Sequence, residues 1–112
     1  MPVQCIQQGR TLTARLSGEV DHHAAKEMMA AMAEEIDAAL PERLVLELSQ
    51  VSFMDSSGIA VLLNLWRRMG QLEGSMTIRH TPTQPLRVLR AAGLDRLLNF
   101  EEEPQSGSPG AE

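Results

Sequence analysis

Hydrophobic and polar residues alternate with a period of two in several short stretches of the chain, which is typical of half-buried strands. The clearest is TLTARLS, in which Leu12, Ala14 and Leu16 share one face. Gly9 and Arg10 precede it and predict a hairpin turn, since glycine accepts a positive φ at little cost. The pattern predicts strands at residues 3–8, 11–17 and 75–80, with a last short strand or turn at 96–100.

Two longer stretches repeat their hydrophobic residues at helical spacing. The first starts after Asp21, a good N-cap, and stops at Pro41, which cannot continue a helix. The second runs from about Ser57 to Met69, with Gly70 as its expected C-terminal cap. On the first, the predicted core face comprises Ala25, Met28, Met29, Met32, Ile36, Ala39 and Leu40. On the second it comprises Ile59, Leu62, Leu63, Trp66 and Met69, widened by Val61 and Leu65.

A shorter helix is predicted in QPLRVLRAA, with Thr83 as its cap and Gly93 as its stop. Between the two long helices, RLVLELS at residues 43–49 is a near-continuous apolar run, typical of a central parallel strand covered on both faces. The order ββαβαβα, followed by a short apolar segment, predicts an α/β fold with a mixed central β-sheet and helices packed mainly on one face. The length of 112 residues suits one domain over residues 1–100, and residues 101–112 are expected to form an acidic, solvated tail.

Charge and cysteine content exclude several classes of protein. The net charge is −5 and no basic run or stripe occurs, so we expect no direct binding to nucleic acid. Cys5 is the single cysteine, which rules out an intramolecular disulfide and suits a small core residue. No apolar run approaches the roughly 20 residues that span a bilayer, and the start MPVQC has no signal-peptide pattern. We therefore expect a cytoplasmic protein that binds neither a membrane nor a cofactor.

Asp21, His22 and His23 stand together and raise the question of a metal site. Neighbouring helical residues point about 100° apart, which suits two ligands of one ion poorly. A capping aspartate followed by two exposed histidines is the simpler interpretation, and we expect no metal.

The two serines of VSFMDSSG, Ser56 and Ser57, stand where the apolar strand gives way to the second helix. Asp55 or Ser56 can cap the free N–H groups of that helix, and capping is one interpretation of the motif. The other is a modification site, because working sites of α/β sheets lie at the carboxyl ends of the strands and a helix N-terminus tolerates a phosphate. A phosphoserine would add roughly −1.5 to −2 charges, which would disrupt an interface while leaving the fold intact.

Three segments carry a resemblance to a known family. GEVDHHAA at residues 18–25, LVLELSQVSFMDSSGIAVLL at 44–63 and LRAAGL at 89–94 together resemble the anti-sigma factor antagonists of the STAS domain family. The likeness is greatest to the sporulation-type antagonists that oppose the anti-sigma F factor, and it runs from about Val3 to Phe100. One departure is that Ile59 and Ala60 stand where many members have Leu-Gly.

The resemblance implies a STAS fold and a partner-switching mechanism. The unphosphorylated antagonist would bind a dimeric anti-sigma factor, which is also an ATP-dependent serine kinase, and so release the sigma factor. Phosphorylation of the first serine, here Ser56, would release the antagonist, and a metal-dependent serine phosphatase would restore it. Asp21 matches the family aspartate beside that serine, and Asp55, Ser57 and Gly58 fall in the same contact region. The chain itself is then expected to be monomeric alone and without catalytic activity.

Two alternatives stay open at this point. A Ser-His-Asp hydrolase would need an activated serine, but Met54 occupies the first glycine position of a Gly-x-Ser-x-Gly elbow around Ser56. Free-standing STAS proteins also resemble accessory subunits of lipid-transporting ABC systems, which generally lack the intact phosphoserine motif that this chain keeps.

Overall fold

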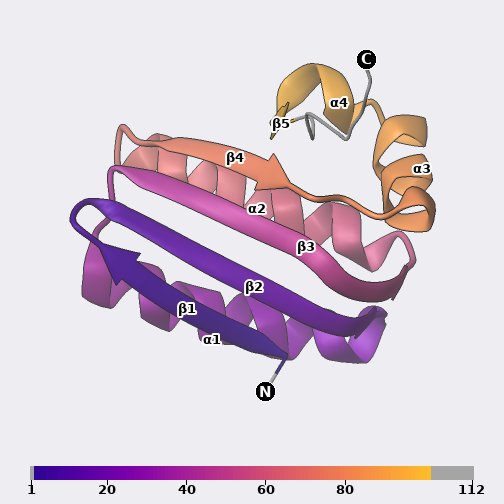
Figure 1. Cartoon of the computed structure of the whole chain (residues 1–112), viewed down its shortest axis with the longest axis horizontal. Coiled ribbons are helices and arrows are strands. Elements are labelled where there is room, and N and C mark those ends of the chain that lie inside the picture. The colour runs from indigo at the N-terminus through magenta and orange to yellow at the C-terminus, as the bar shows by residue number, and fades with distance from the viewer. Residues whose placement is uncertain (1, 102–112) are drawn as a thin grey trace, which may run out of the picture.

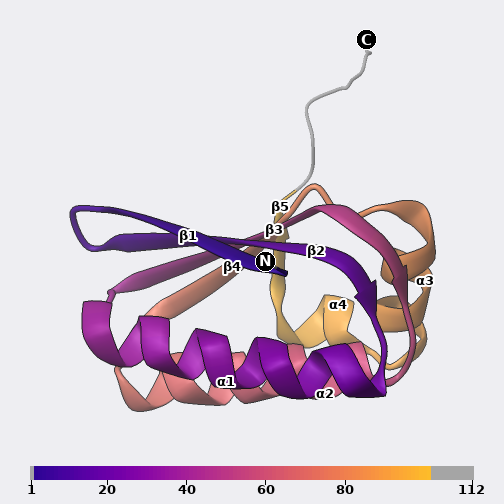
Figure 2. The same cartoon turned by 90° about the horizontal axis from the view of Figure 1, so that it is seen from below.

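The computed structural model describes residues 2–101, which form a five-stranded sheet with helices on one face (Figures 1 and 2). In chain order the elements are β1 (Val3–Gln8), β2 (Thr11–Val20), α1 (His22–Ala39), β3 (Arg43–Met54), α2 (Ser57–Gln71), β4 (Ser75–Arg79), α3 (Thr83–Ala91), α4 (Leu94–Leu97) and β5 (Asn99–Glu101). The strands lie side by side in the order β1-β2-β3-β4-β5. β1 is antiparallel to β2 and the other neighbouring pairs are parallel, which confirms the predicted mixed α/β sheet.

The core lies between the sheet and the two long helices, which run side by side beneath it in Figure 2. The inward face of β2 is as predicted, because Leu12, Ala14 and Leu16 are buried. On α1 the buried residues are Ala25, Met28, Met32 and Ile36. Leu40 departs from the prediction: it is 55% exposed, because it takes a left-handed conformation with φ 45° where the helix ends.

β3 is longer than the sequence predicts. It does not end near Ser49, because β2 continues beside it to the pair Val20↔Met54 and supplies backbone partners along the way. The prediction that β3 is covered on both faces is also wrong. Only alternate residues, such as Leu44 and Leu46, are buried, whereas Val45 between them is half-buried, because the long helices cover one face of the sheet.

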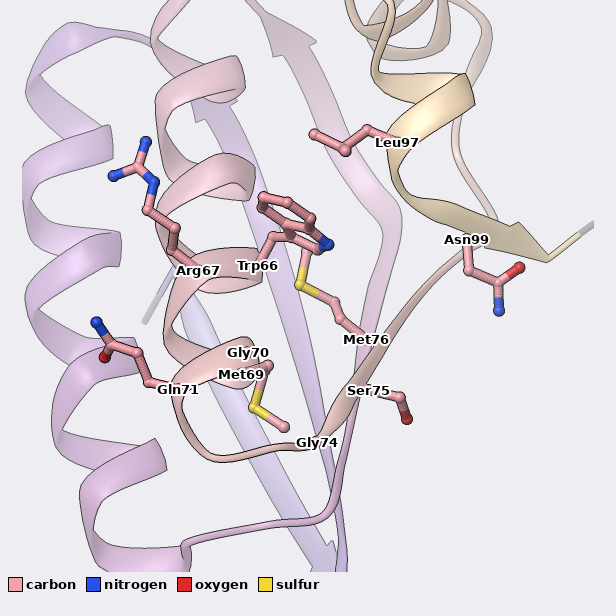
Figure 3. A pocket seen from close by; sticks show the side chains of 10 residues that line it. All are labelled: Trp66, Arg67, Met69, Gly70, Gln71, Gly74, Ser75, Met76, Leu97 and Asn99. Atoms are coloured by element: carbon pink, nitrogen blue, oxygen red, sulfur yellow. The ribbon is translucent and has the colours of Figure 1, made fainter.

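α2 differs from its prediction at two positions. It passes through Gly70 and ends at Gln71, so that Leu72 rather than Gly70 is the C-cap. Trp66 is 40% exposed instead of buried, and Val61 and Leu65 take the inward positions with Leu62. Trp66 lines an apolar pocket of about 600 Å³ and points toward Leu97 of α4 (Figure 3).

The C-terminal part completes the sheet. Thr83 is not the cap of α3 as predicted, because it is the first residue of the helix and Pro82 takes the N-cap position. Gly93, with φ 81°, ends this segment as predicted, and RLLNF divides between α4 and β5. Glu101, which the sequence places in the tail, is the last residue of β5 and pairs with Arg79 of β4. The rest of the predicted tail lies outside the described residues. Within residues 2–101, no helix combines the length and the apolar character that a transmembrane span requires.

Candidate functional site

The turn between β3 and α2 presents Ser56 to solvent. Ser56 occupies the N-cap position with helical backbone angles, φ −62° and ψ −17°, and its side chain makes no capping hydrogen bond. The cap comes from Asp55 instead, whose Oδ1 accepts from the backbone N–H of Ser57 at 2.7 Å. Of the two candidate caps, Asp55 therefore caps α2, and the exposed Ser56 hydroxyl is not required for capping.

Backbone hydrogen bonds hold this turn on both sides. The N–H of Asp55 donates to the carbonyl of Val20 at 3.2 Å, which joins the turn to the end of β2. The N–H of Gly58 donates to the carbonyl of Asp55 at 3.0 Å, and that of Ile59 donates to Ser56 at 3.1 Å. These bonds give the turn a defined backbone conformation, while the Ser56 side chain stays exposed to solvent.

Beneath the turn, Met54 is fully buried and is held at two points. Its side chain lies against the bare Cα of buried Gly58, where a Cβ would collide with the Met54 Cγ and Sδ. Its backbone N–H donates to Oε1 of Gln84 on α3, and its carbonyl accepts from Nε2 of Gln84, both at 2.8 Å. Gly58 thus lies below the surface that a partner would touch, and it allows the close packing that supports the turn.

Asp21 lies at the same end of the sheet as Asp55, because β2 and β3 are parallel and Val20 pairs with Met54. Asp21 is the N-cap of α1, and its Oδ1 accepts from the Ala24 N–H at 2.9 Å. The structure therefore brings the five predicted site residues together from two neighbouring strand ends: Asp21, Asp55, Ser56, Ser57 and Gly58.

Two exposed residues near the turn were not predicted from the sequence. Phe53 is 42% exposed and pairs in register with Glu19 of β2. With Asp21 and Asp55, Glu19 gives this end of β2 and β3 an acidic character. Phe53 was missed because β3 was expected to end at Ser49, which left the aromatic residue in a loop.

A separate polar cluster lies on the open face of the sheet. Register places Glu47 of β3 beside Arg15 and Arg79 of the neighbouring strands. Oε2 of Glu47 lies 2.6 Å from Nδ1 of His80, and its Oε1 accepts from the Ser49 N–H at 3.2 Å. Desolvation by burial acts to raise the pKa of Glu47, but these hydrogen bonds from His80 and Ser49 outweigh it and lower that pKa below its ordinary value.

Comparison with known proteins gives matches over most of the chain. The family model described as STAS domain matches residues 3–107. An anti-sigma F factor antagonist from Paenibacillus polymyxa is 36% identical over 87 residues, which cover 78% of this chain and 74% of the relative. The solved structure of the unphosphorylated anti-sigma factor antagonist SpoIIAA is similar with a TM-score of 0.76 and 26% identity, over 93% of this chain and 91% of that one. The phosphorylated form of the Bacillus cell fate determinant SpoIIAA gives a TM-score of 0.67 and 27% identity, over 93% and 95% of the two chains.

Proposed function

The chain belongs to the STAS domain family, and from that premise we propose that it is an anti-sigma factor antagonist switched by phosphorylation of Ser56. In the unphosphorylated form it binds an anti-sigma factor that is also a serine kinase, and the sigma factor is released. Phosphorylation of Ser56 by that kinase ends the binding, and a serine phosphatase restores the active form. We place this switch in sporulation control in the cytoplasm, as the resemblance to the sporulation-type antagonists implies.

The observation that carries the proposal is the Ser56 hydroxyl, which is exposed on a turn whose hydrogen bonds it does not supply. Because Asp55 provides the cap, a phosphate can be added to Ser56 without the loss of a structural bond. The N–H groups of Ser57, Gly58 and Ile59 already have acceptors, and the dipole of α2 favours an anion at this position. We therefore expect the phosphorylated domain to keep its fold.

The phosphate is expected to weaken binding of the partner. Asp21 and Asp55 already make this end of the sheet acidic, and a phosphoserine adds roughly −1.5 to −2 charges. A partner surface that covers Asp21, Asp55, Ser56 and Ser57 would have to desolvate that charge beside two carboxylates. Exposed Phe53 stands next to this surface and would be covered with it. The chain acts here as a binding protein and contributes no catalytic group.

The test combines mass spectrometry with binding measurements. The chain is incubated with ATP and the anti-sigma factor of the same genome, and we expect one phosphate on Ser56. Ser56→Ala should accept no phosphate and should bind as tightly as the unmodified chain, whereas Ser56→Asp should bind at least tenfold more weakly by calorimetry. Ser57→Ala is the matched control and should still be phosphorylated.

Phosphate on Ser57 alone would contradict the assignment of the acceptor. Equal affinity of Ser56→Ala and Ser56→Asp would contradict gating by charge. Co-purification with a transporter ATPase instead of an anti-sigma factor would favour the accessory subunit of a lipid-transporting ABC system. Labelling of Ser56 by a serine-reactive probe, without partner or ATP, would favour a hydrolase.

A further inference from the structure

We propose that Gln84 is a positioning residue for the Ser56 turn, which it holds through the backbone of Met54. The inference rests on the proposed function, since it concerns how Ser56 is presented to the partner. Gln84 lies on α3, thirty residues along the chain from Met54, and none of the recognised motifs contains it.

The need for such a residue follows from the unequal lengths of the parallel strands. β4 pairs with β3 only from Arg43↔Ser75 to Glu47↔Arg79, although β3 continues to Met54. On its other side, β3 has β2 as a partner up to the pair Val20↔Met54. The end of β3 therefore has a strand on one side and lacks β4 on the other, at the point where the Ser56 turn begins.

Gln84 supplies the missing partner. Its Oε1 accepts from the Met54 N–H and its Nε2 donates to the Met54 carbonyl, each at 2.8 Å. A primary amide offers the same donor and acceptor as a peptide group, so this side chain replaces one residue of a neighbouring strand. Both bonds are partly buried, and partly buried backbone groups are costly to leave unpaired.

The effect of this clamp reaches Ser56 through Met54 and Asp55. The Met54 side chain is fixed under Gly58 in the first turn of α2, while Gln84 fixes its backbone. Asp55 follows directly, and its bonds to Val20 and Ser57 shape the turn that carries the hydroxyl. Without the clamp, the backbone of Met54 keeps a partner only on the β2 side, so Met54 and the turn that follows it become more mobile. A partner that recognises the folded surface must then use binding free energy to order the turn.

The test uses the full chain with Gln84→Met, which keeps the length of the side chain and its preference for helix but removes both hydrogen bonds. We expect the Met54 amide to exchange at least tenfold faster by NMR, with faster exchange also at the amides of Ser57 and Gly58. In phosphorylation by the anti-sigma kinase, KM should rise about tenfold while kcat stays within twofold, because the ordered turn is recovered once the complex forms. Thr83→Ala, at the exposed neighbouring position on α3, is the matched control and should change neither readout.

A second variant protects the test against a failure of Gln84→Met to fold. Gln84→Glu keeps an acceptor for the Met54 N–H but places a carboxylate oxygen against the Met54 carbonyl, which repels it. Amide exchange at Ser57 and Gly58 and the KM should therefore rise as they do in Gln84→Met. The proposal is overturned if either variant leaves Ser57 and Gly58 as protected as in the unchanged chain, or leaves KM unchanged. If the unchanged chain accepts no phosphate at all, the proposed function fails, and the exchange measurement still decides whether Gln84 positions the turn.

Discussion

Replacing glycine by alanine at two positions of α2 should change the stability of the domain in opposite directions. At Gly70 the position is exposed and an added Cβ meets nothing within 4 Å, so the higher helix propensity of alanine should stabilise the fold by about 0.5–1 kcal/mol. At Gly58 the added Cβ collides with Cγ and Sδ of buried Met54. Overpacking of this kind costs about 1–3 kcal/mol, which exceeds the gain in propensity and leaves a net loss of about 1 kcal/mol.

These values predict a clear difference in thermal unfolding. For a domain of this size, 1 kcal/mol corresponds to about 4–8 °C, so Gly58→Ala and Gly70→Ala should differ in Tm by roughly 6–16 °C. Circular dichroism during heating and in urea measures both variants, and equal m-values would show that the unfolded states are comparable. In a Met54→Ala background the colliding atoms are gone, and Gly58→Ala should no longer destabilise.

The reasoning would be refuted if Gly58→Ala proved as stable as Gly70→Ala. It would also be refuted if the loss at Gly58 persisted unchanged in the Met54→Ala background. Either result would mean that Met54 does not pack under Gly58, and the support that this contact gives to the Ser56 turn would fall with it.

Three further predictions concern residues around the sheet. Asp21→Ala removes the N-cap bond of α1 and should cost about 1 kcal/mol in thermal unfolding, while Glu19→Ala, at an exposed neighbouring position, should have little effect. The pKa of Glu47 is lower in the folded state than in the unfolded chain, so Glu47 stabilises the fold at a pH above its unfolded-state pKa. This contribution is lost as the pH falls through the folded-state pKa, and Glu47→Gln should therefore flatten the acid side of a stability–pH profile. Desolvation by burial, with the charge of Glu35, raises the pKa of the Cys5 thiol to about 11, so iodoacetamide at pH 8 should alkylate Cys5 much more slowly in the native than in the urea-unfolded chain.

Local hydrophobic patterns were sufficient to predict the type and order of most helices and strands, because the periodicity of each element involves residues close together in the chain. The end of β3 was misjudged because Ser49 and Gln50 interrupt the apolar run, and only pairing with β2 keeps the strand extended beyond them. The position of Trp66 was misjudged for a different reason. Its neighbour Leu65 is about 100° away around the helix, and spacing alone does not decide which of two overlapping apolar stripes faces the sheet.

The candidate site, too, could be predicted only in part from the sequence. The serines were predicted as a working site because they follow the carboxyl end of a strand, whereas Asp21 was placed beside them by the resemblance to the anti-sigma factor antagonists. Which residue caps α2 was left open, and the bond from Asp55 to Ser57 decides it. Gln84 had no signal in the sequence, since a side-chain bond to a backbone thirty residues away follows no local period.

The arrangement of strands in chain order has a consequence for synthesis of the protein on the ribosome. Each strand pairs with the one made just before it, so the sheet can grow by one strand at a time as the chain emerges. Ser56 is already present when β3 and α2 are complete, but Gln84 follows only after β4, at the start of α3. If Gln84 positions the turn as proposed, a nascent chain that has not yet exposed α3 would carry Ser56 on a turn without the two Gln84 hydrogen bonds, and the proposed switch would become competent only after residue 84 has been made.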